Sequence, residues 1–410
     1  MNQYLYPMEN PIQNYAWGSR TALAGLQGRA DPVVQPEAEL WMGAHPKAPS
    51  KVRIGGAWAA LPTVLAQNPG AFLGGGAAAS AGSLPYLFKV LAAAEPLSIQ
   101  AHPSQSQARE GFAREDRQGI PRDAPQRNYR DPNHKPELIC ALAPFWALCG
   151  FRPAAEIRAL FNRLCPLALG DELRQLEHCK PDDFLRQFFA LLMELAPDRR
   201  RAVTGEALAN ARDLMDESEQ YRWITILNEK YPGDIGILAP AFLNCLCLEP
   251  GQALFLPAGE LHAYLDGTAI EIMANSDNVL RGGLTPKHVD VPELLQVLNF
   301  RSRTPQVLTP RALAGGEARY PTWADEFQLS VIELDGHREY SGNSPVSAEI
   351  LLAVSGRAEI RIPETGEALT LDQGRSVLIP AIAPEYRISG PACLYKAAVP
   401  RPADVLKEKG

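Results

Sequence analysis

The sequence predicts a mainly β protein with a helical insertion, in which two small antiparallel barrels of jelly-roll type are joined to an α-helical domain. Three observations lead to this prediction. Short strand-like runs separated by Pro and Gly fill residues 1 to about 150 and return after residue 227. Between them, residues 153–226 carry Leu, Phe and Ala at helical spacing. A short spaced pattern then occurs twice, once in each strand-rich region.

The helical insertion is clearest in the run DDFLRQFFALLMEL, residues 182–195. Its apolar positions 184, 185, 188, 191, 192 and 195 form one broad helical face, and Pro197 is expected to close the helix. We therefore expect residues 153–226 to interrupt a discontinuous first barrel made of residues 1–152 and 227–305. A break rich in Pro, Arg and Gly separates it from a second barrel, residues 316–400.

The repeated pattern links the two strand-rich regions. The first copy starts at Gly251, has a proline six positions later and ends at His262. The second copy starts at Gly374 and ends, at the same spacing, at Glu385. Each copy reads as a turn, a hydrophobic strand and a proline turn, which is the corner of a small antiparallel barrel. Two copies favour two jelly-roll barrels. The alternative is a coincidence of common turn residues.

Composition excludes several classes of function. The 410-residue chain has a net charge of −7, which argues against nucleic acid or an acidic membrane as partner. A local cluster of Arg and Lys can still hold a small anion. The N-terminus lacks the pattern of a signal peptide, and no apolar run reaches the ~18 residues that span a bilayer. The seven scattered cysteines include no CxxC pair. We expect a soluble cytoplasmic protein with reduced thiols.

One strand-like run, residues 96–103, places polar side chains on a single face. Ser98, Gln100 and His102 alternate with apolar neighbours, and side chains alternate across a strand. The opposite face carries Leu97, Ile99 and Ala101. If the polar face lines a barrel interior, its groups need partners, and a metal ion is one such partner. The pattern fits equally well a half-exposed edge strand whose polar side chains face water.

Two further residues favour the metal. His262 follows a Pro-Ala-Gly turn at the lip of the first barrel, and Glu137 precedes the strand-like LICAL. Two imidazoles, one carboxylate and one amide oxygen suit a borderline divalent ion, with zinc first. A site without thiolates indicates a catalytic rather than a structural metal.

Basic residues occur in short polar segments elsewhere in the chain: Lys89, Lys135, Arg281 and Lys287. Each one alone fits a solvated surface charge. The combination with a metal site favours a functional role for Lys89, Lys135 and Arg281.

Several runs together resemble a known family. They are YAWGS (15–19), ELWMGAHP (39–46), LPYLFKVL and LSIQAHPS (within 84–104), DPNHKPEL (131–138), PAGELHAYL (257–265) and SDNVLRGGLTPKHVDV (276–291). These runs are similar to type I mannose-6-phosphate isomerases of the cupin superfamily, and the resemblance extends from the N-terminus to about residue 300. The C-terminal barrel matches in general character only. One departure is Asp266, which stands where the family's barrel corner usually has Asn, and we expect it to affect the turn alone.

The resemblance implies a fold, a cofactor and a reaction. It implies two cupin-like barrels, the second without metal, which agrees with Glu385 standing in the place of His262. It implies one Zn²⁺ per chain and the interconversion of mannose 6-phosphate and fructose 6-phosphate through an enediol. A sugar phosphate is the expected partner, with no nucleic acid and no membrane, and the chain is expected to be a monomer.

The resemblance also assigns roles to residues. The zinc ligands are expected to be Gln100, His102, Glu137 and His262. Catalytic roles are expected for Arg281, Lys135, His134, Asp277 and Glu271. Substrate contacts are expected for Trp17, Lys89, Ser98, Tyr264 and Lys287. Which residue serves as the proton-transfer base stays open among Lys135, Asp277 and Glu271, and His134 is a candidate for ring opening.

Two other classes of function remain as alternatives. A cupin oxygenase would prefer iron held by two His and one carboxylate, and Gln100 as a fourth ligand argues against it. A non-catalytic sugar-binding cupin would need neither a base nor Arg281 beside the metal. Metal analysis and an isomerase assay separate the three.

Overall fold

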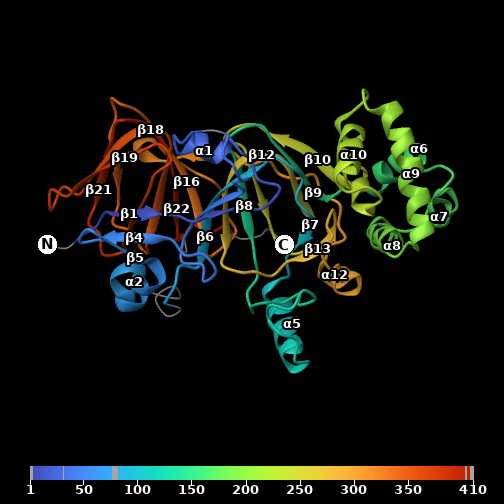
Figure 1. Cartoon of the computed structure of the whole chain (residues 1–410), viewed down its shortest axis with the longest axis horizontal. Helices are drawn as coiled ribbons and strands as arrows, with labels where there is room; N and C mark the ends of the chain where they lie inside the picture. Colours follow the sequence, from blue (N-terminus) through green and yellow to red (C-terminus); the bar gives the residue numbers. More distant parts are fainter. Residues whose placement is uncertain (1–2, 31, 76–81, 402–403, 407–410) are drawn as a thin grey trace.

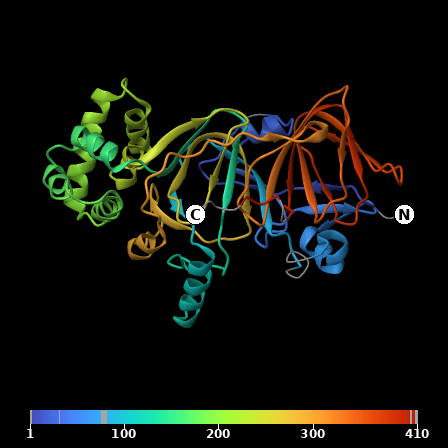
Figure 2. The same cartoon turned by 180° about the vertical axis from the view of Figure 1, so that it is seen from behind.

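The computed structural model describes residues 3–30, 32–75, 82–401 and 404–406, and these form two antiparallel sheets and a group of helices. The three parts follow one another in a row: helices at one end, the first sheet in the middle and the C-terminal strands at the other end (Figure 1). The reverse view shows the same order (Figure 2). No helix in the described ranges is long and apolar enough to cross a membrane.

The first sheet has ten strands. They are β2 (Ile12–Gln13), β3 (Glu39–Met42), β6 (Tyr86–Ala93), β7 (Ile99–Ala101), β8 (Glu137–Ala141), β9 (Phe145–Phe151), β10 (Leu243–Leu248), β11 (Ala253–Leu256), β12 (His262–Ala274) and β13 (Leu280–Gly283). The long strand β12 is central, because it pairs with β6, β7, β8 and β9. Its residues therefore meet side chains from four other strands.

The second sheet has twelve strands. They are β1 (Tyr6–Glu9), β4 (Lys51–Ile54), β5 (Ala57–Ala60), β14 (Arg311–Ala312), β15 (Glu317–Arg319), β16 (Gln328–Asp335), β17 (Tyr340–Gly342), β18 (Glu349–Arg361), β19 (Ala368–Asp372), β20 (Ser376–Ile379), β21 (Tyr386–Ser389) and β22 (Pro391–Ala398). Most of these strands come from the expected second barrel.

The N-terminal strands join this second sheet rather than the first. β1 pairs antiparallel with β20, with Tyr6 opposite Leu378, and the hairpin β4–β5 pairs with β1 in turn. The expected segment 1–152 therefore contributes strands to both sheets. The physical reason is that a strand pattern specifies which face is buried but not which edge the strand joins.

The helical segment lies between β9 and β10 and runs further than residues 153–226. It contains α6 (Ala154–Leu164), α7 (Gly170–Gln175), α8 (Pro181–Met193), α9 (Pro197–Leu214), α10 (Glu219–Lys230), the 3-10 helix η1 (Ile235–Leu238) and α11 (Ala239–Phe242). Pro197 begins α9 instead of closing α8, because the first helical position needs no N–H donor. The helix α8 buries Phe184, Leu185, Phe188 and Leu192, as its apolar spacing predicts.

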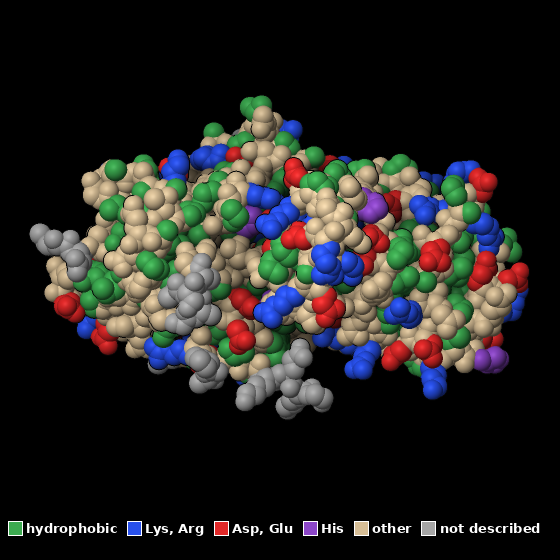
Figure 3. All heavy atoms as spheres, turned by 90° about the horizontal axis from the view of Figure 1, so that it is seen from below, with side chains coloured by type: hydrophobic (Ala, Val, Ile, Leu, Met, Phe, Trp, Pro, Cys, Tyr) green, Lys and Arg blue, Asp and Glu red, His purple; other side chains and the backbone are tan. Residues whose placement is uncertain are grey.

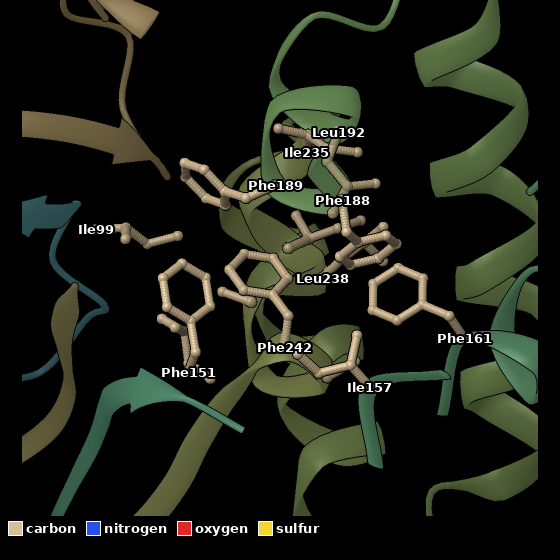
Figure 4. Close-up of a cluster of buried hydrophobic side chains, with 14 of the residues drawn as sticks. Ile99, Phe151, Ile157, Phe161, Phe188, Phe189, Leu192, Ile235, Leu238 and Phe242 are labelled. Carbon is tan, nitrogen blue, oxygen red and sulfur yellow. The ribbon is translucent and has the colours of Figure 1, made fainter. Parts of the chain in front are cut away.

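The helical segment shares one hydrophobic core with the first sheet. Phe188 and Phe161 pack edge to face within the helices, with ring centroids 4.7 Å apart. The same buried cluster continues through Phe151 of β9 to Ile99 of β7 (Figure 4). The apolar face of β7 is therefore anchored by the helices, which leaves its other face for polar side chains.

Short helices complete the structure: α1 (Ala22–Leu26), α2 (Leu61–Gln67), α3 (Pro69–Leu73), α5 (Gln105–Arg117), α12 (Val291–Val297) and the 3-10 helix η2 (Ala314–Gly316). The helix α5 extends from the first sheet on one side of the molecule (Figure 1). It starts with a capping box in which the Ser104 side chain accepts from the Gln107 N–H.

The repeated pattern of the sequence marks two matching corners. β11 runs into β12 in the first sheet, and β20 runs into β21 in the second. Both starting glycines, Gly251 (φ 84°) and Gly374 (φ 73°), lie in the left-handed region that favours glycine. The corners end differently, because His262 is buried whereas Glu385 is exposed.

Candidate metal centre

Strand β7 is not an edge strand, which decides between the two interpretations of its polar face. It pairs with β12 on one side, where Gln100 lies opposite His262, and with β13 on the other, where Gln100 lies opposite Arg281. Because side chains alternate along a strand, Gln100 and the following His102 face away from Ile99 and Ala101. On that face His102 is buried and Gln100 is half-buried. Ile99 and Ala101 face the helical core.

Three side chains from different strands converge there. His102, Glu137 and His262 each offer a ligand atom, and these atoms all lie within 4.8 Å of one another. His102 Nε2 is 3.3 Å from Glu137 Oε1, and His262 Nε2 is 3.4 Å from Glu137 Oε2. All three are at most 2% exposed. Gln100 joins them through its amide, whose Nε2 position is 3.4 Å from His262 Nε2.

Both imidazole rings are oriented by backbone carbonyls. His102 Nδ1 lies 2.7 Å from the carbonyl oxygen of Asn278, and His262 Nδ1 lies 3.0 Å from that of Glu260. A carbonyl only accepts hydrogen bonds, so we assign the proton of each ring to Nδ1. Each Nε2 then presents a lone pair toward Glu137. Histidine ligands of metals in proteins are commonly held in this way.

The centre contains a buried polar atom without a hydrogen-bond partner. Among the described residues, His102 Nε2 is buried and forms no hydrogen bond, whereas the buried Glu137 Oε1 has the Lys135 ammonium 2.8 Å away. A buried lone pair is costly unless a partner occupies the space between it and the Glu137 carboxylate. The donors are a lone-pair nitrogen and a carboxylate oxygen, so a divalent cation fits this space.

The protonation states of these residues suit a metal. Burial lowers the pKa of His102 to about 4, so the ring is neutral near pH 7. Burial alone would raise the pKa of Glu137, but Lys135 and His102 outweigh it and hold that pKa well below its usual range. A neutral imidazole and an ionised carboxylate are the forms that bind metals. Gln100 adds an amide oxygen if its amide is turned, because the two ends of an amide are nearly equivalent in shape.

Two buried lysines lie beside this centre, each paired with a carboxylate. Lys135 Nζ is 2.8 Å from Glu137 Oε1, and Lys89 Nζ is 2.8 Å from Glu271 Oε2. Burial would lower the pKa of Lys89, but Glu271 and Glu39 raise it above its ordinary value. Burial raises the pKa of Glu271, with Lys89 opposing.

Three cations gather on the other side of β7. The pKa of Arg281 is lowered by burial and by Arg130, and the pKa of Lys287 is lowered by burial and by both arginines. Within the described part of the chain, none of the three forms an ion pair. Arg130 and Arg281 are half-buried, and Lys287 is exposed. Unpaired cations that repel one another favour an anionic ligand.

The remaining predicted residues fall into two groups. Tyr264 is 2% exposed, with its hydroxyl 3.4 Å from Glu137 Oε2, and Trp17 packs against the cluster that contains Tyr264. Ser98 is half-buried, just ahead of β7. Tyr264 therefore belongs to strand β12 of the centre, whereas Trp17 and Ser98 lie outside the strands.

His134 and Asp277 are held by residues outside the metal cluster. His134 Nε2 is 2.6 Å from Glu326 Oε1, a residue that precedes β16 of the second sheet. Both line a cavity of about 540 Å³ between the two sheets, and none of the four predicted zinc ligands lines it. Asp277 pairs with Lys47 at 2.9 Å and faces His45 at 3.6 Å.

Sequence reasoning missed three residues of this region: His45, Arg130 and Glu39. His45 and Glu39 lie inside the run ELWMGAHP, and Arg130 directly precedes DPNHKPEL. The sequence therefore contained a signal for all three residues, because each one lies in or next to a motif already singled out. Charge alone does not show it, since basic and acidic side chains are interspersed over the middle of the face drawn in Figure 3.

Comparisons with known proteins show which family this chain resembles. Residues 5–154 match the family model for the catalytic domain of type I phosphomannose isomerase. The mannose-6-phosphate isomerase of Salmonella typhimurium is 42% identical over 385 residues, 93% of this chain and 96% of that protein. The human mannose-6-phosphate isomerase is 34% identical, covering 92% of this chain and 93% of that protein.

Solved structures agree. A phosphomannose isomerase of Salmonella typhimurium with a lysine replaced by alanine superposes with a TM-score of 0.89 at 39% identity, covering 97% of this chain and 100% of that one. A mannose 6-phosphate isomerase bound with zinc and yttrium gives 0.88 at 40% identity, with the same coverage.

Fold and site together define a mainly β protein with a buried His–Glu–His metal centre. The relatives that match it over nearly their whole length are mannose-6-phosphate isomerases. The chain belongs to the type I phosphomannose isomerase family.

Proposed function

We propose that this chain is a zinc-dependent isomerase that interconverts mannose 6-phosphate and fructose 6-phosphate through an enediol, with one zinc ion held by Gln100, His102, Glu137 and His262. The observation that carries the proposal is the convergence of His102, Glu137 and His262, whose ligand atoms all lie within 4.8 Å of one another, with His102 Nε2 buried and without a hydrogen-bond partner among the described residues. The name of the relatives and the zinc in one solved neighbour support the substrate and the metal.

The zinc ion and the cationic side chains have different proposed roles in this reaction. When bound, zinc supplies Lewis acidity toward the substrate oxygens. Lys287 and Arg130 suit the phosphate, because they are cations without ion-pair partners among the described residues. Arg281 lies directly opposite the proposed ligand Gln100 on β13. It suits the negative charge that develops on the sugar oxygens, because it stays protonated.

The proton between C1 and C2 needs a base whose pKa is near the working pH. Glu271 is the best supported candidate, because burial raises its pKa while Lys89 stays within 2.8 Å to share its proton. Asp277 is less suitable. Its pKa is lowered, because the Lys47 hydrogen bond, His45 and Lys135 outweigh the effect of burial. Lys135 is engaged with Glu137, and Glu326 holds His134 at the junction of the sheets.

Tyr264, Trp17 and Ser98 complete the proposed pocket as substrate contacts. Tyr264 is the most constrained of them, since it is buried and within reach of Glu137. The rings of Trp17 and Tyr15 lie 5.7 Å apart, so Trp17 is part of an aromatic pair.

We also propose how the chain divides. The first cupin-like jelly-roll barrel comprises residues 1–152 and 227–305, and the second, metal-free barrel comprises residues 316–400. The helical insertion comprises residues 153–226, and the helices up to Phe242 extend it. The exposed Glu385 at the second corner supports a barrel without metal. In this proposal the N-terminal strands β1, β4 and β5 reach across to the second barrel. We also propose a cytoplasmic monomer, and the seven free cysteines support a reducing compartment.

An isomerase assay with and without a chelator tests the function. Purified protein should convert mannose 6-phosphate to fructose 6-phosphate, detected by coupled enzymes. Removal of the metal, checked by elemental analysis, should abolish the activity, and added Zn²⁺ should restore it. Full activity in protein shown to be metal-free would contradict the zinc-dependent mechanism, and no activity in the zinc-loaded protein would contradict the proposed reaction.

A further inference from the structure

Two residues of one short loop hold the carboxylate of Asp277. Lys47 Nζ lies 2.9 Å from Oδ2, and His45 Nε2 lies 3.6 Å from Oδ1. The backbone of Asp277 is fixed separately, because its N–H donates to Asp131 Oδ2 at 2.7 Å. The side chain is 28% exposed. Lys47 therefore holds one carboxylate oxygen, His45 faces the other at a distance longer than a hydrogen bond, and part of the group stays accessible.

The His45 ring itself has one defined orientation. It is 4% exposed, and its Nδ1 accepts the N–H of Lys47 at 3.3 Å. Because Nδ1 accepts, the proton of the neutral ring is on Nε2, the atom that faces Asp277. The ring also packs edge-on against Trp41, with centroids 4.9 Å apart.

The charges around His45 keep it neutral. Burial lowers its pKa, and the cations Lys47, Lys89 and Lys135 lower it further, while Asp277 alone opposes them. A neutral ring whose Nε2–H faces a carboxylate oxygen at 3.6 Å attracts the carboxylate electrostatically without neutralising it. The three lysines also connect this loop to the proposed site, because Lys89 pairs with Glu271 and Lys135 with Glu137.

We infer that His45 is a positioning residue of the sugar-phosphate site: the dipole of its buried Nε2–H, 3.6 Å from Oδ1, acts with Lys47 to orient the carboxylate of Asp277 as an ionised acceptor for a substrate hydroxyl. This inference rests on the proposed function. It gives Asp277 a binding role and leaves the transfer of the C–H proton to another group.

Two replacements of His45 separate positioning from packing. His45→Phe keeps a ring against Trp41 but removes the N–H. His45→Gln loses the ring but places an amide N–H near the position of Nε2. We expect His45→Phe to lower kcat/KM about tenfold, mainly through KM, because the N–H dipole that faces a partly buried charge is lost. His45→Gln should stay within about threefold of the wild type. A packing role predicts the reverse order.

The zinc-loaded full chain is used for all variants, with metal content measured in each. In an Asp277→Asn background, His45→Phe should cause no further loss, because the two residues act through one contact. The exposed His178 supplies the matched control, His178→Gln, with unchanged kinetics. The inference is overturned if His45→Phe behaves like wild type, if His45→Gln falls as far as His45→Phe, or if the losses add in the double variant.

A second measurement does not depend on activity. Nitrogen-15 NMR of the wild type, with the His45 ring assigned by its absence in His45→Phe or His45→Gln, should show a neutral Nε2–H tautomer at pH 7. An Nδ1–H tautomer or a protonated ring would overturn the inference. If the wild type shows no isomerase activity, the proposed function fails while this spectrum still decides the role of His45 toward Asp277.

Discussion

Replacement of His262 by alanine is expected to remove the metal and the activity together. His262 is 1% exposed and its Nε2 faces Glu137 at 3.4 Å, so the change deletes one of two imidazole ligands from a closed site. Glu137 then keeps a buried charge with one partner fewer. Loss of Lewis-acid stabilisation should cost several kcal/mol, or about 10³-fold in kcat. Elemental analysis and the coupled assay on the same sample measure both effects.

The control for this variant is His178→Ala, which removes an exposed histidine of the helical segment and should change neither quantity. Circular dichroism establishes that both variants are folded. A folded, metal-free His262→Ala protein with full activity would contradict the metal centre as the catalytic site.

Replacement of Arg281 by alanine is expected to leave the metal bound and lower kcat by about 10²–10³-fold, the usual effect of removing a group that stabilises developing negative charge. Arg281 lies across from Gln100 on the neighbouring strand, and its pKa is lowered by burial and by Arg130. Such a cation costs stability in the absence of an anion, so the folded variant should be at least as stable as the wild type. Steady-state kinetics and metal analysis test both statements.

Arg212→Ala serves as the matched control, since Arg212 is an exposed arginine of α9. If Arg281→Ala retains the wild-type kcat, Arg281 takes no part in stabilising the charge. If it loses the metal, its role is to support the proposed ligands rather than the substrate.

Local sequence patterns were sufficient to predict which residues of the metal centre share one face of a strand. The alternation along residues 97–102 predicts that Gln100 and His102 share a face, and the structure places both inside the first sheet. Whether this face meets water or an interior depends on the partners of β7, which lie more than a hundred residues away. Periodicity describes one strand, whereas burial is a property of several strands.

Other features depend on contacts between residues that are far apart in the sequence, so local sequence patterns could not predict them. The pairing of Tyr6 with Leu378 joins the two ends of the chain, and no local feature of YPME indicates it. His45 looks like an ordinary loop histidine until the fold brings Asp277 to it. His134 belongs to a motif beside Lys135, yet its ring is turned to Glu326 of the second sheet. Adjacent residues of one motif can therefore face different parts of the molecule.

The position of zinc in the protein tests the central claim most directly. A crystal of the zinc-loaded chain, with anomalous differences measured on both sides of the zinc absorption edge, should show one ion bound by Nε2 of His102, Nε2 of His262, a carboxylate oxygen of Glu137 and the amide oxygen of Gln100. Zinc bound at another group of residues, with His102 and Glu137 binding no metal, would contradict the account.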